Sequence, residues 1–271
     1  MNCADLIAGL EGEMSANTQW LRIHAAEGLL DNGESREKVA QLFRKESETA
    51  TAPYRIGVWR VLARSTDGDE RVRNIENIRA VLRDPQATDR ISAAESLGKL
   101  NAVGRDDRAV IFQWLKTADD ATAAFPRWLL VLSSTAEGRR EDEAGLAALV
   151  CSNDAVARIR AAFALGRSKN PASDSIAKIR EQLKVEPSDS IARIYLIAAL
   201  LLHETEASAI AALEKQLLPY RNGKANEQLE FGIVTGLRGK PENIPLLEPL
   251  LKSREADARI GAANGLLQLL K

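Results

Sequence analysis

One short phrase recurs along the whole chain and constrains its fold more than any other feature of the sequence. The phrase begins with an arginine and a branched apolar residue, continues with a variable residue and two small or apolar residues, and reaches a leucine three places later, as in residues 158–165. Clear or looser copies start at positions 22, 55, 90, 127, 158, 193, 230 and 259, so successive starts are 29 to 37 residues apart. A period of this length is typical of stacked helical units, none of which can bury its apolar face alone.

The spacing of apolar residues predicts two helices in each unit. Residues one, four, seven and eight places after the arginine fall on one side of a helix, and a second amphipathic segment, such as residues 176–183, precedes each copy. We therefore predict an all-α fold, a right-handed α-solenoid (α/α superhelix) of about eight helical hairpins. The single array should have units near residues 1–33, 34–68, 69–104, 105–139, 140–171, 172–205, 206–240 and 241–271.

Two copies carry a resemblance to a known family. They are residues 154–166 and the phrase Asp257-Ala258-Arg259-Ile260-Gly261-Ala262-Ala263. This pattern resembles HEAT repeats, an armadillo-like helical architecture, and is most similar to the short HEAT-like repeats of phycobilisome-lyase-type proteins. The resemblance implies a solenoid whose concave face is lined by the second helix of each unit. It specifies an architecture and not an activity.

The recurring arginines suggest either a positive binding stripe or a structural ladder, and the ladder is the favoured interpretation. Asp154, Asp189 and Glu255 each stand four residues before an arginine, near a predicted helix start, where they can cap the helix and pair with arginines of the same or the adjacent unit. The chain has 37 Lys and Arg against 38 Asp and Glu, a net charge of −1. Such a balance argues against broad attraction to nucleic acid or to an anionic membrane.

Residues two, five and nine places after the arginine face away from the predicted core, and by the HEAT resemblance they line the concave surface. The fourth to sixth units place an apolar row there, flanked by arginines: Leu129, Leu132, Arg160, Phe163, Arg167, Tyr195 and Leu202. We predict that this row forms a groove for a peptide or helix, anchored by Phe163 and Tyr195 and oriented by Arg160 and Arg167. The alternative is that tight curvature buries the row inside the solenoid.

The first three units present a charged patch at the same positions, and the last two present a small, neutral surface. The charged patch consists of His24, Glu27, Arg60, Arg64, Glu95 and Lys99. His24 beside Glu27 could form an acid/base pair, although ordinary helix surface is the favoured interpretation. Gly232 and Gly261 belong to the neutral stretch, which could admit close approach of another backbone.

The sequence favours a binding protein over an enzyme, and we expect no catalytic residue, metal or cofactor. The two histidines and two cysteines show no metal-ligand spacing, and Gly239-Lys240 is followed by Pro241, so no phosphate loop is present. The leading hypothesis is a noncatalytic scaffold for a protein or peptide of unknown identity. The resemblance also leaves open a tetrapyrrole lyase or chaperone-like protein and, less favoured, a nucleic-acid-binding protein similar to HEAT-like DNA glycosylases.

The ends of the chain and its cysteines bear on location and assembly. Residues 1–6 lack the basic start of a signal peptide, and Cys3 and Cys151 lie too many units apart to pair, so we expect a cytoplasmic protein without a membrane partner. Residues 266–271 lack an evident polar capping helix. We therefore expect the last unit to continue into a longer chain or to be covered by another subunit, for example in a homodimer.

Overall fold

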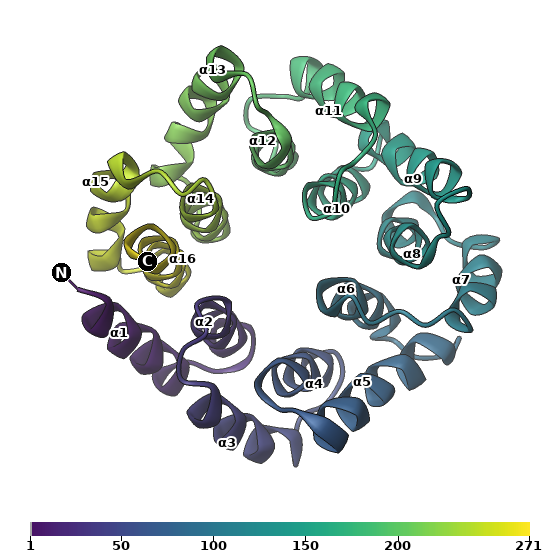
Figure 1. The fold of residues 1–271 in the computed structure, drawn as a ribbon, viewed down its shortest axis with the longest axis horizontal. Helices are drawn as coiled ribbons and strands as arrows, with labels where there is room; N and C mark the ends of the chain where they lie inside the picture. The colour runs from purple at the N-terminus through teal and green to yellow at the C-terminus, as the bar shows by residue number, and fades with distance from the viewer. Residues whose placement is uncertain (1) are drawn as a thin grey trace. The chain divides into compact units, whose positions relative to one another are not determined.

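The computed structural model describes residues 2–271, which contain 16 α-helices, four short 3-10 segments and no strand. The predicted all-α fold is confirmed. Figure 1 shows the order of the helices. They are α1 (Cys3–Ala16), α2 (Gln19–Asp31), α3 (Arg36–Ser47), α4 (Tyr54–Ser65), α5 (Gly68–Arg83), α6 (Arg90–Leu100), α7 (Asp107–Leu115), α8 (Asp120–Ser133), α9 (Arg139–Ala148), α10 (Ala155–Gly166), α11 (Ser173–Val185), α12 (Ala192–His203), α13 (Ala207–Leu217), α14 (Ala225–Leu237), α15 (Ile244–Leu247) and α16 (Ala256–Leu270).

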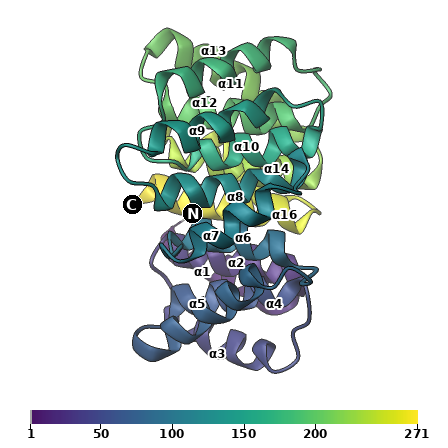
Figure 2. The same ribbon diagram turned by 90° about the vertical axis from the view of Figure 1, so that its right-hand side faces the viewer.

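The chain divides into two compact units. Unit 1 consists of Met1–Asn74 and Glu214–Lys271, and unit 2 consists of Ile75–Leu213. In unit 1, α2 packs on α1 and α4, while α16 packs on α14. In unit 2, α8 packs on α6, α7 and α10, and α10 packs on α12; Figure 2 shows α9, α10 and α11 lying side by side. Helices thus contact both the other helix of their pair and the matching helix of the next pair.

The apolar side predicted for the second helix of each pair forms the core of both units. Ile23, Ala26 and Leu29 of α2 are fully buried, as are Ala162 and Leu165 of α10. Burying one leucine side chain contributes about 1.5–3 kcal/mol, and the alanines let neighbouring helices approach closely.

Helices α14 and α16 of unit 1 approach each other through glycine. A Cβ atom added to Gly232 would lie 2.8 Å from the backbone nitrogen of Ala262 and closer still to the carbonyl of Gly261. A Cβ atom on Gly261 would lie 2.7 Å from the carbonyl oxygen of Leu229. The assignment of Gly232 and Gly261 to a neutral surface is wrong, because both are buried where α14 packs on α16. The close backbone approach that these glycines could admit does occur there, and only glycine leaves room for it.

We predict that Gly232→Ala lowers the free energy of unfolding by about 1–3 kcal/mol, because rigid backbone atoms must move to accept the new methyl group. Gly12→Ala is the matched control, since Gly12 lies in α1 with no atom within 4 Å of an added Cβ. That control should be neutral or stabilising by up to about 1 kcal/mol. Urea unfolding of both variants measures the difference, and equal effects would contradict the proposed packing.

The C-terminal helix is covered by the first helical pair of the same chain. Within unit 1, α16 packs on α1 and α2. Arg259 donates from Nε to Glu13 Oε1 at 2.5 Å and from Nη2 to Glu13 Oε2 at 3.0 Å. Asn32 Nδ2 donates to Asn264 Oδ1 at 2.9 Å. Helices α1 and α2 thus cover part of α16 within unit 1, and the expectation of a longer chain or a homodimer stays a prediction.

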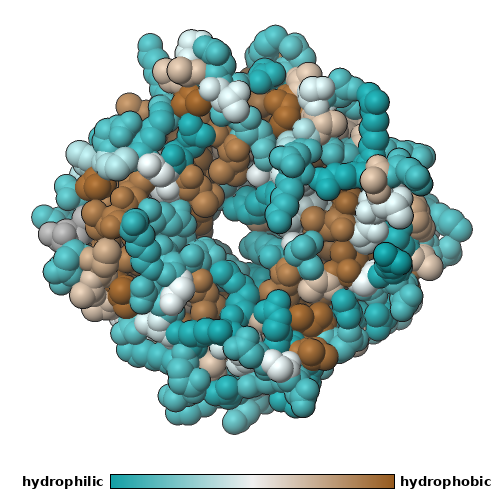
Figure 3. Space-filling view, viewed as in Figure 1, coloured by the Kyte–Doolittle hydropathy of each residue, from teal (hydrophilic) through white to brown (hydrophobic). Residues whose placement is uncertain are grey.

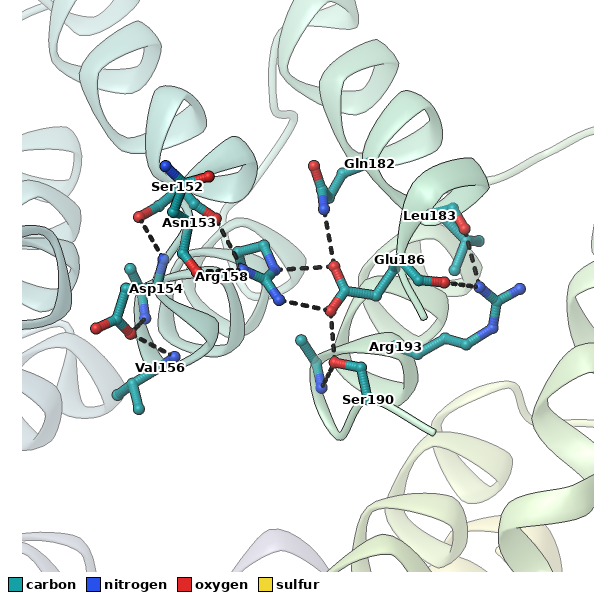
Figure 4. Close-up of polar contacts among 12 residues, drawn as sticks. Ser152, Asn153, Asp154, Val156, Arg158, Gln182, Leu183, Glu186, Ser190 and Arg193 are labelled. Atoms are coloured by element: carbon teal, nitrogen blue, oxygen red, sulfur yellow. Dashed lines mark hydrogen bonds and ion pairs between the residues drawn. The ribbon is translucent and has the colours of Figure 1, made fainter. Parts of the chain in front are cut away.

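Arginines at the start of the repeated phrase form hydrogen bonds with other residues of the protein (Figure 4). Arg158 donates from Nε and Nη2 to the two carboxylate oxygens of Glu186, both at 2.8 Å, and from Nη1 to the Ser152 carbonyl at 2.8 Å. Arg193 Nη1 donates to the carbonyls of Leu183 and Glu186 at 3.0 and 2.8 Å. The structural interpretation of these arginines is confirmed.

The acidic partners of the arginines differ from those predicted. Asp154 does cap α10, accepting from the backbone N–H groups of residues 156 and 157 at 2.7 and 3.1 Å. However, the carboxylate that pairs with Arg158 belongs to Glu186, 28 residues further along the chain. The side chain of Glu255 forms no capping hydrogen bond. Asp189 is exposed. Arg158, near the start of α10, therefore pairs with Glu186 at the C-terminal end of α11, the next α-helix in the chain.

The environment of Glu186 makes the ladder sensitive to pH. Burial raises the pKa of this carboxyl, but hydrogen bonds from Arg158, Ser190 and Gln182 together outweigh burial and lower the pKa below its ordinary value of 4.5. A carboxyl whose pKa is lower in the folded state stabilises the fold above its unfolded pKa, and this contribution is lost as the pH falls through the folded pKa.

We predict that Glu186→Gln reduces the free energy of unfolding more at neutral pH than at acidic pH, because the wild-type carboxyl also becomes neutral as the pH falls through its lowered pKa. Glu181→Gln is the control on the same helix, because its pair with Lys184 is about two-thirds exposed. That substitution should change the free energy of unfolding only slightly at both pH values. Denaturant unfolding at each pH measures the difference, and a penalty for Glu186→Gln that is independent of pH contradicts the argument.

Candidate functional site

The predicted apolar row lies entirely in unit 2, on three helices that pack in succession. Its residues come from α8 (Leu129, Leu132), α10 (Arg160, Phe163, Arg167) and α12 (Tyr195, Leu202). All except Leu129 are partly exposed. Leu129 is fully buried, which corrects its assignment to a binding surface. The reason is that α8 is covered by α6 on one side and α10 on the other.

Three aromatic side chains meet between α8 and α10. The ring of Phe163 packs edge-on against Phe125, at 6.2 Å between centroids, and against Trp128, at 6.1 Å. Phe125 and Trp128 are buried, whereas Phe163 is partly exposed. Trp128 fills the space left by Gly98, whose added Cβ would lie 3.0 Å from the indole Cδ2 atom. Trp128 is therefore a core residue.

Three cations lie over these aromatic rings. The Arg167 guanidinium carbon is 3.6 Å from the centroid of Phe163, and Lys99 Nζ is 5.3 Å from the same ring. The Arg160 guanidinium carbon is 5.6 Å from the centroid of Phe125. Cations at such distances are attracted to the negative face of the ring, and stacking fixes the plane of a guanidinium group. We call Lys99, Phe125, Trp128, Arg160, Phe163 and Arg167 the arginine–aromatic cluster.

Arg160 and Arg167 differ from the ladder arginines in their partners. Arg160 Nη1 donates to the Ala121 carbonyl at 2.6 Å, but neither arginine forms an ion pair within residues 2–271. Lys99, in contrast, pairs with Glu95 at 2.8 Å. Burial lowers the pKa of the Arg160 guanidinium, although an arginine stays charged at neutral pH. The charges of Glu95, Asp119 and Asp154 act in the opposite direction to burial and favour the charged form of Arg160. The cluster therefore holds two partly buried arginines that stack on aromatic rings and form no direct ion pair.

In unit 1 the arginines of the predicted charged patch form ion pairs with acidic side chains. Arg60 Nε donates to Glu27 Oε1 at 2.7 Å, and Arg64 Nη2 donates to Asp31 Oδ1 at 2.6 Å. Arg60 is only 3% exposed, which corrects its assignment to an open patch; it lies between α4 and α2, covered by its own partner Glu27. Glu95 and Lys99 belong to unit 2. These contacts join neighbouring helices and neutralise the charges of the patch.

His24 pairs with a residue other than the one considered from the sequence. Its Nδ1 atom lies 3.1 Å from Asp257 Oδ1, which comes from α16. Glu27 instead accepts a hydrogen bond from Arg60, so the acid/base pair of His24 and Glu27 is not supported. The His24 contact helps to join α2 to α16.

A small pocket of about 200 Å³ lies between α1 and α16 in unit 1. It is lined by Asp5, Leu6, Gly9, Glu13, Leu251, Arg259 and Ala263. The charges of Glu13 and Arg259 are joined by their two hydrogen bonds, so the remaining wall is largely apolar. None of the residues predicted as a binding site lines this pocket.

Hydrophobic surface alone does not single out a site. On the face seen in Figure 3, hydrophobic side chains occur in separate patches among hydrophilic ones. Within residues 2–271, no group of three or more His, Cys, Asp or Glu side chains could hold a metal ion, and none of the described helices has the length and apolar character needed to cross a membrane. The arrangement of cations and aromatic rings is therefore the more informative signal.

Comparison with known proteins finds no match, either among protein-family models or among curated proteins.

Two members of the cluster, Phe125 and Trp128, were not among the predicted site residues. Both belong to Phe125-Pro126-Arg127-Trp128, where the fourth copy departs from the repeated phrase. That departure was the available signal, because Trp128 replaces the usual branched residue after the arginine and Phe125 lies one turn before Leu129. Only the packing of α8 on α10 shows that they meet Phe163.

We predict that Glu27→Ala lowers the free energy of unfolding by more than Asp31→Ala does, because it removes a carboxylate that accepts a hydrogen bond from the buried Arg60. Asp31→Ala is the matched control in the same pair of helices, since Asp31 and Arg64 are 39% and 25% exposed. It should cost about 0–1 kcal/mol. Urea unfolding at low ionic strength compares the two, and similar losses contradict the distinction between a buried and an exposed pair.

Proposed function

We propose that the protein is a noncatalytic scaffold that binds a protein or peptide through the arginine–aromatic cluster. We also propose that its helices form a HEAT-like, right-handed α-solenoid of about eight hairpins. The recurring period supports this architecture, as do the contacts between matching helices of successive pairs and the repeated arginine bonds.

The observation that carries the functional proposal is the contrast between two sets of arginines. Ladder arginines such as Arg158 and Arg259 satisfy their guanidinium groups with a carboxylate and with backbone carbonyls. Arg160 and Arg167 are stacked on aromatic rings and form no ion pair. Arg160 is stabilised by the Ala121 carbonyl and by the charges of nearby carboxylates, but neither it nor Arg167 has the two-bond carboxylate partner of a ladder arginine. A carboxylate of a bound peptide would supply such a partner.

The geometry favours a peptide over a flat aromatic ligand or a nucleic acid. Arg167 already lies over the ring of Phe163 at 3.6 Å, and the edges of Phe125 and Trp128 surround that ring. Stacking of a base or of a tetrapyrrole needs an open aromatic face. The partly exposed Leu132, Tyr195 and Leu202 instead offer apolar surface around the two charges, as expected for a peptide groove.

Peptides that bind the protein are first selected from a random display library on the immobilised wild-type protein. We predict that they bind at least about tenfold more weakly to a Phe163→Ala, Tyr195→Ala double variant than to the wild-type protein, because the variant lacks two aromatic side chains of the surface. Phe112→Ala is the matched control: Phe112 is 48% exposed and also lies beneath an arginine, Arg108, but that arginine is paired with Asp142. It should leave the affinity unchanged. Fluorescence anisotropy measures the affinities.

Thermal unfolding monitored by circular dichroism shows whether the double variant remains folded at the temperature of the binding assay. Peptides that bind the wild-type protein and the folded double variant equally well contradict the proposed site. Binding of a bilin in an absorbance titration, with no selectable peptide, contradicts the proposed class of ligand.

A further inference from the structure

The pocket between α1 and α16 of unit 1 has an apolar floor. Leu6 and Ala263 line it and are almost fully buried, and Leu251 adds a partly exposed side chain. The volume of about 200 Å³ exceeds that of an apolar protein cavity of about 150 Å³ that takes up benzene. The pocket can therefore hold an apolar group of the size of a substituted benzene ring.

Gly9 leaves the space of this pocket open. Asp5, Gly9 and Glu13 follow one another at intervals of four residues, so they share one face of α1, and all three line the pocket. A Cβ atom added to Gly9 would have no atom within 4 Å. Packing therefore does not require glycine here, in contrast to Gly232 and Gly261, and a large side chain at this position would fill the pocket.

The charges in the wall of the pocket are not all paired. Glu13 and Arg259 share two hydrogen bonds, and the remaining Arg259 nitrogen, Nη1, donates to two backbone carbonyls. Asp5 is exposed and accepts a hydrogen bond from the backbone N–H of Asn2 at 3.3 Å, but it forms no ion pair within residues 2–271. The charge left for a ligand is therefore that of a carboxylate.

We infer that the pocket binds a small apolar molecule that carries an ammonium group, as in an arylalkyl amine. The apolar part displaces water from Leu6, Leu251 and Ala263, and the ammonium group donates hydrogen bonds to the carboxylate of Asp5. An anion of the same size finds no such partner, because Arg259 is already paired with a glutamate.

Such a ligand contacts both α1 and α16 and therefore also stabilises the packing of these two helices. The site belongs to unit 1, whereas the arginine–aromatic cluster belongs to unit 2. The inference thus adds a second binding site and does not rest on the proposed peptide-binding function.

The test uses three probes that share a phenyl ring and differ in charge: phenethylammonium, phenethyl alcohol and hydrocinnamate. Each is titrated into the full-length protein with carbon-13 in its leucine methyl groups, and NMR follows the methyl shifts. Leu6 and Leu251 report on the pocket. Leu218 is the internal control, because it is 42% exposed and does not line the pocket.

We expect phenethylammonium to shift the methyl signals of Leu6 and Leu251 in a saturable way and to leave those of Leu218 in place. Its affinity should be at least about fivefold higher than that of hydrocinnamate, because the carboxylate of Asp5 attracts one probe and repels the other. Asp5→Asn, which keeps the size of the side chain, should remove the preference for phenethylammonium over phenethyl alcohol.

Gly9→Leu should weaken the binding of phenethylammonium at least about tenfold, because the new side chain occupies the pocket. Gly12→Leu is the matched control: Gly12 also lies in α1 with no atom within 4 Å of an added Cβ, but it does not line the pocket. It should leave the affinity unchanged. Leucine favours a helix more than glycine does, so both variants are expected to fold.

Four results overturn the inference. They are the absence of a saturable shift at Leu6 and Leu251 up to about 10 mM phenethylammonium, equal affinity of the wild-type protein and Gly9→Leu, binding of hydrocinnamate as tight as that of phenethylammonium, and a preference for phenethylammonium that persists in Asp5→Asn. The peptide-binding function is tested separately through Phe163, so it stands or falls independently of these results.

Discussion

The rest of the structure depends on the hydrogen-bonded pairing of an arginine at the start of one helix with a glutamate at the end of another. Arg158 with Glu186 and Arg259 with Glu13 share the same two-bond geometry, and Arg22 forms an ion pair with Glu46. Each pair joins one pair of helices to another, and the same arginines also satisfy carbonyls at helix ends. Apolar burial supplies most of the stabilising free energy, while these directional bonds help to set the register of one helical pair on another.

The pairing of Arg259 with Glu13 has a structural consequence within unit 1. The arginine of the last helix uses a glutamate of α1 in the way that Arg158 uses Glu186. His24 with Asp257 and Asn32 with Asn264 add contacts between α2 and α16. Helix α16 is thereby joined to α1 and α2 within unit 1.

The arginines of the candidate binding surface have different partners from the ladder arginines. Arg160 occupies a variable position two places after Arg158, and its guanidinium group lies over Phe125, not against a glutamate. Arg167 lies over Phe163 in the same way. The ladder arginines thus form ion pairs within the protein, whereas the two cluster arginines stack on aromatic rings and form no direct ion pair. The two roles differ because the neighbouring side chain is acidic in one case and aromatic in the other.

The sequence by itself determined the helical fold, the helix that begins at each arginine phrase and the apolar positions that form the core, because these follow from local spacing. It also placed Phe163, Arg160 and Arg167 on one side of a helix. Only the tertiary structure decided that Leu129 and Arg60 are buried, that Glu186 and Glu13 are the acidic partners of the ladder, and that Phe125 joins the cluster. Those features depend on contacts between helices far apart in the chain, and helical periodicity fixes the direction of a side chain but not the neighbour that it meets.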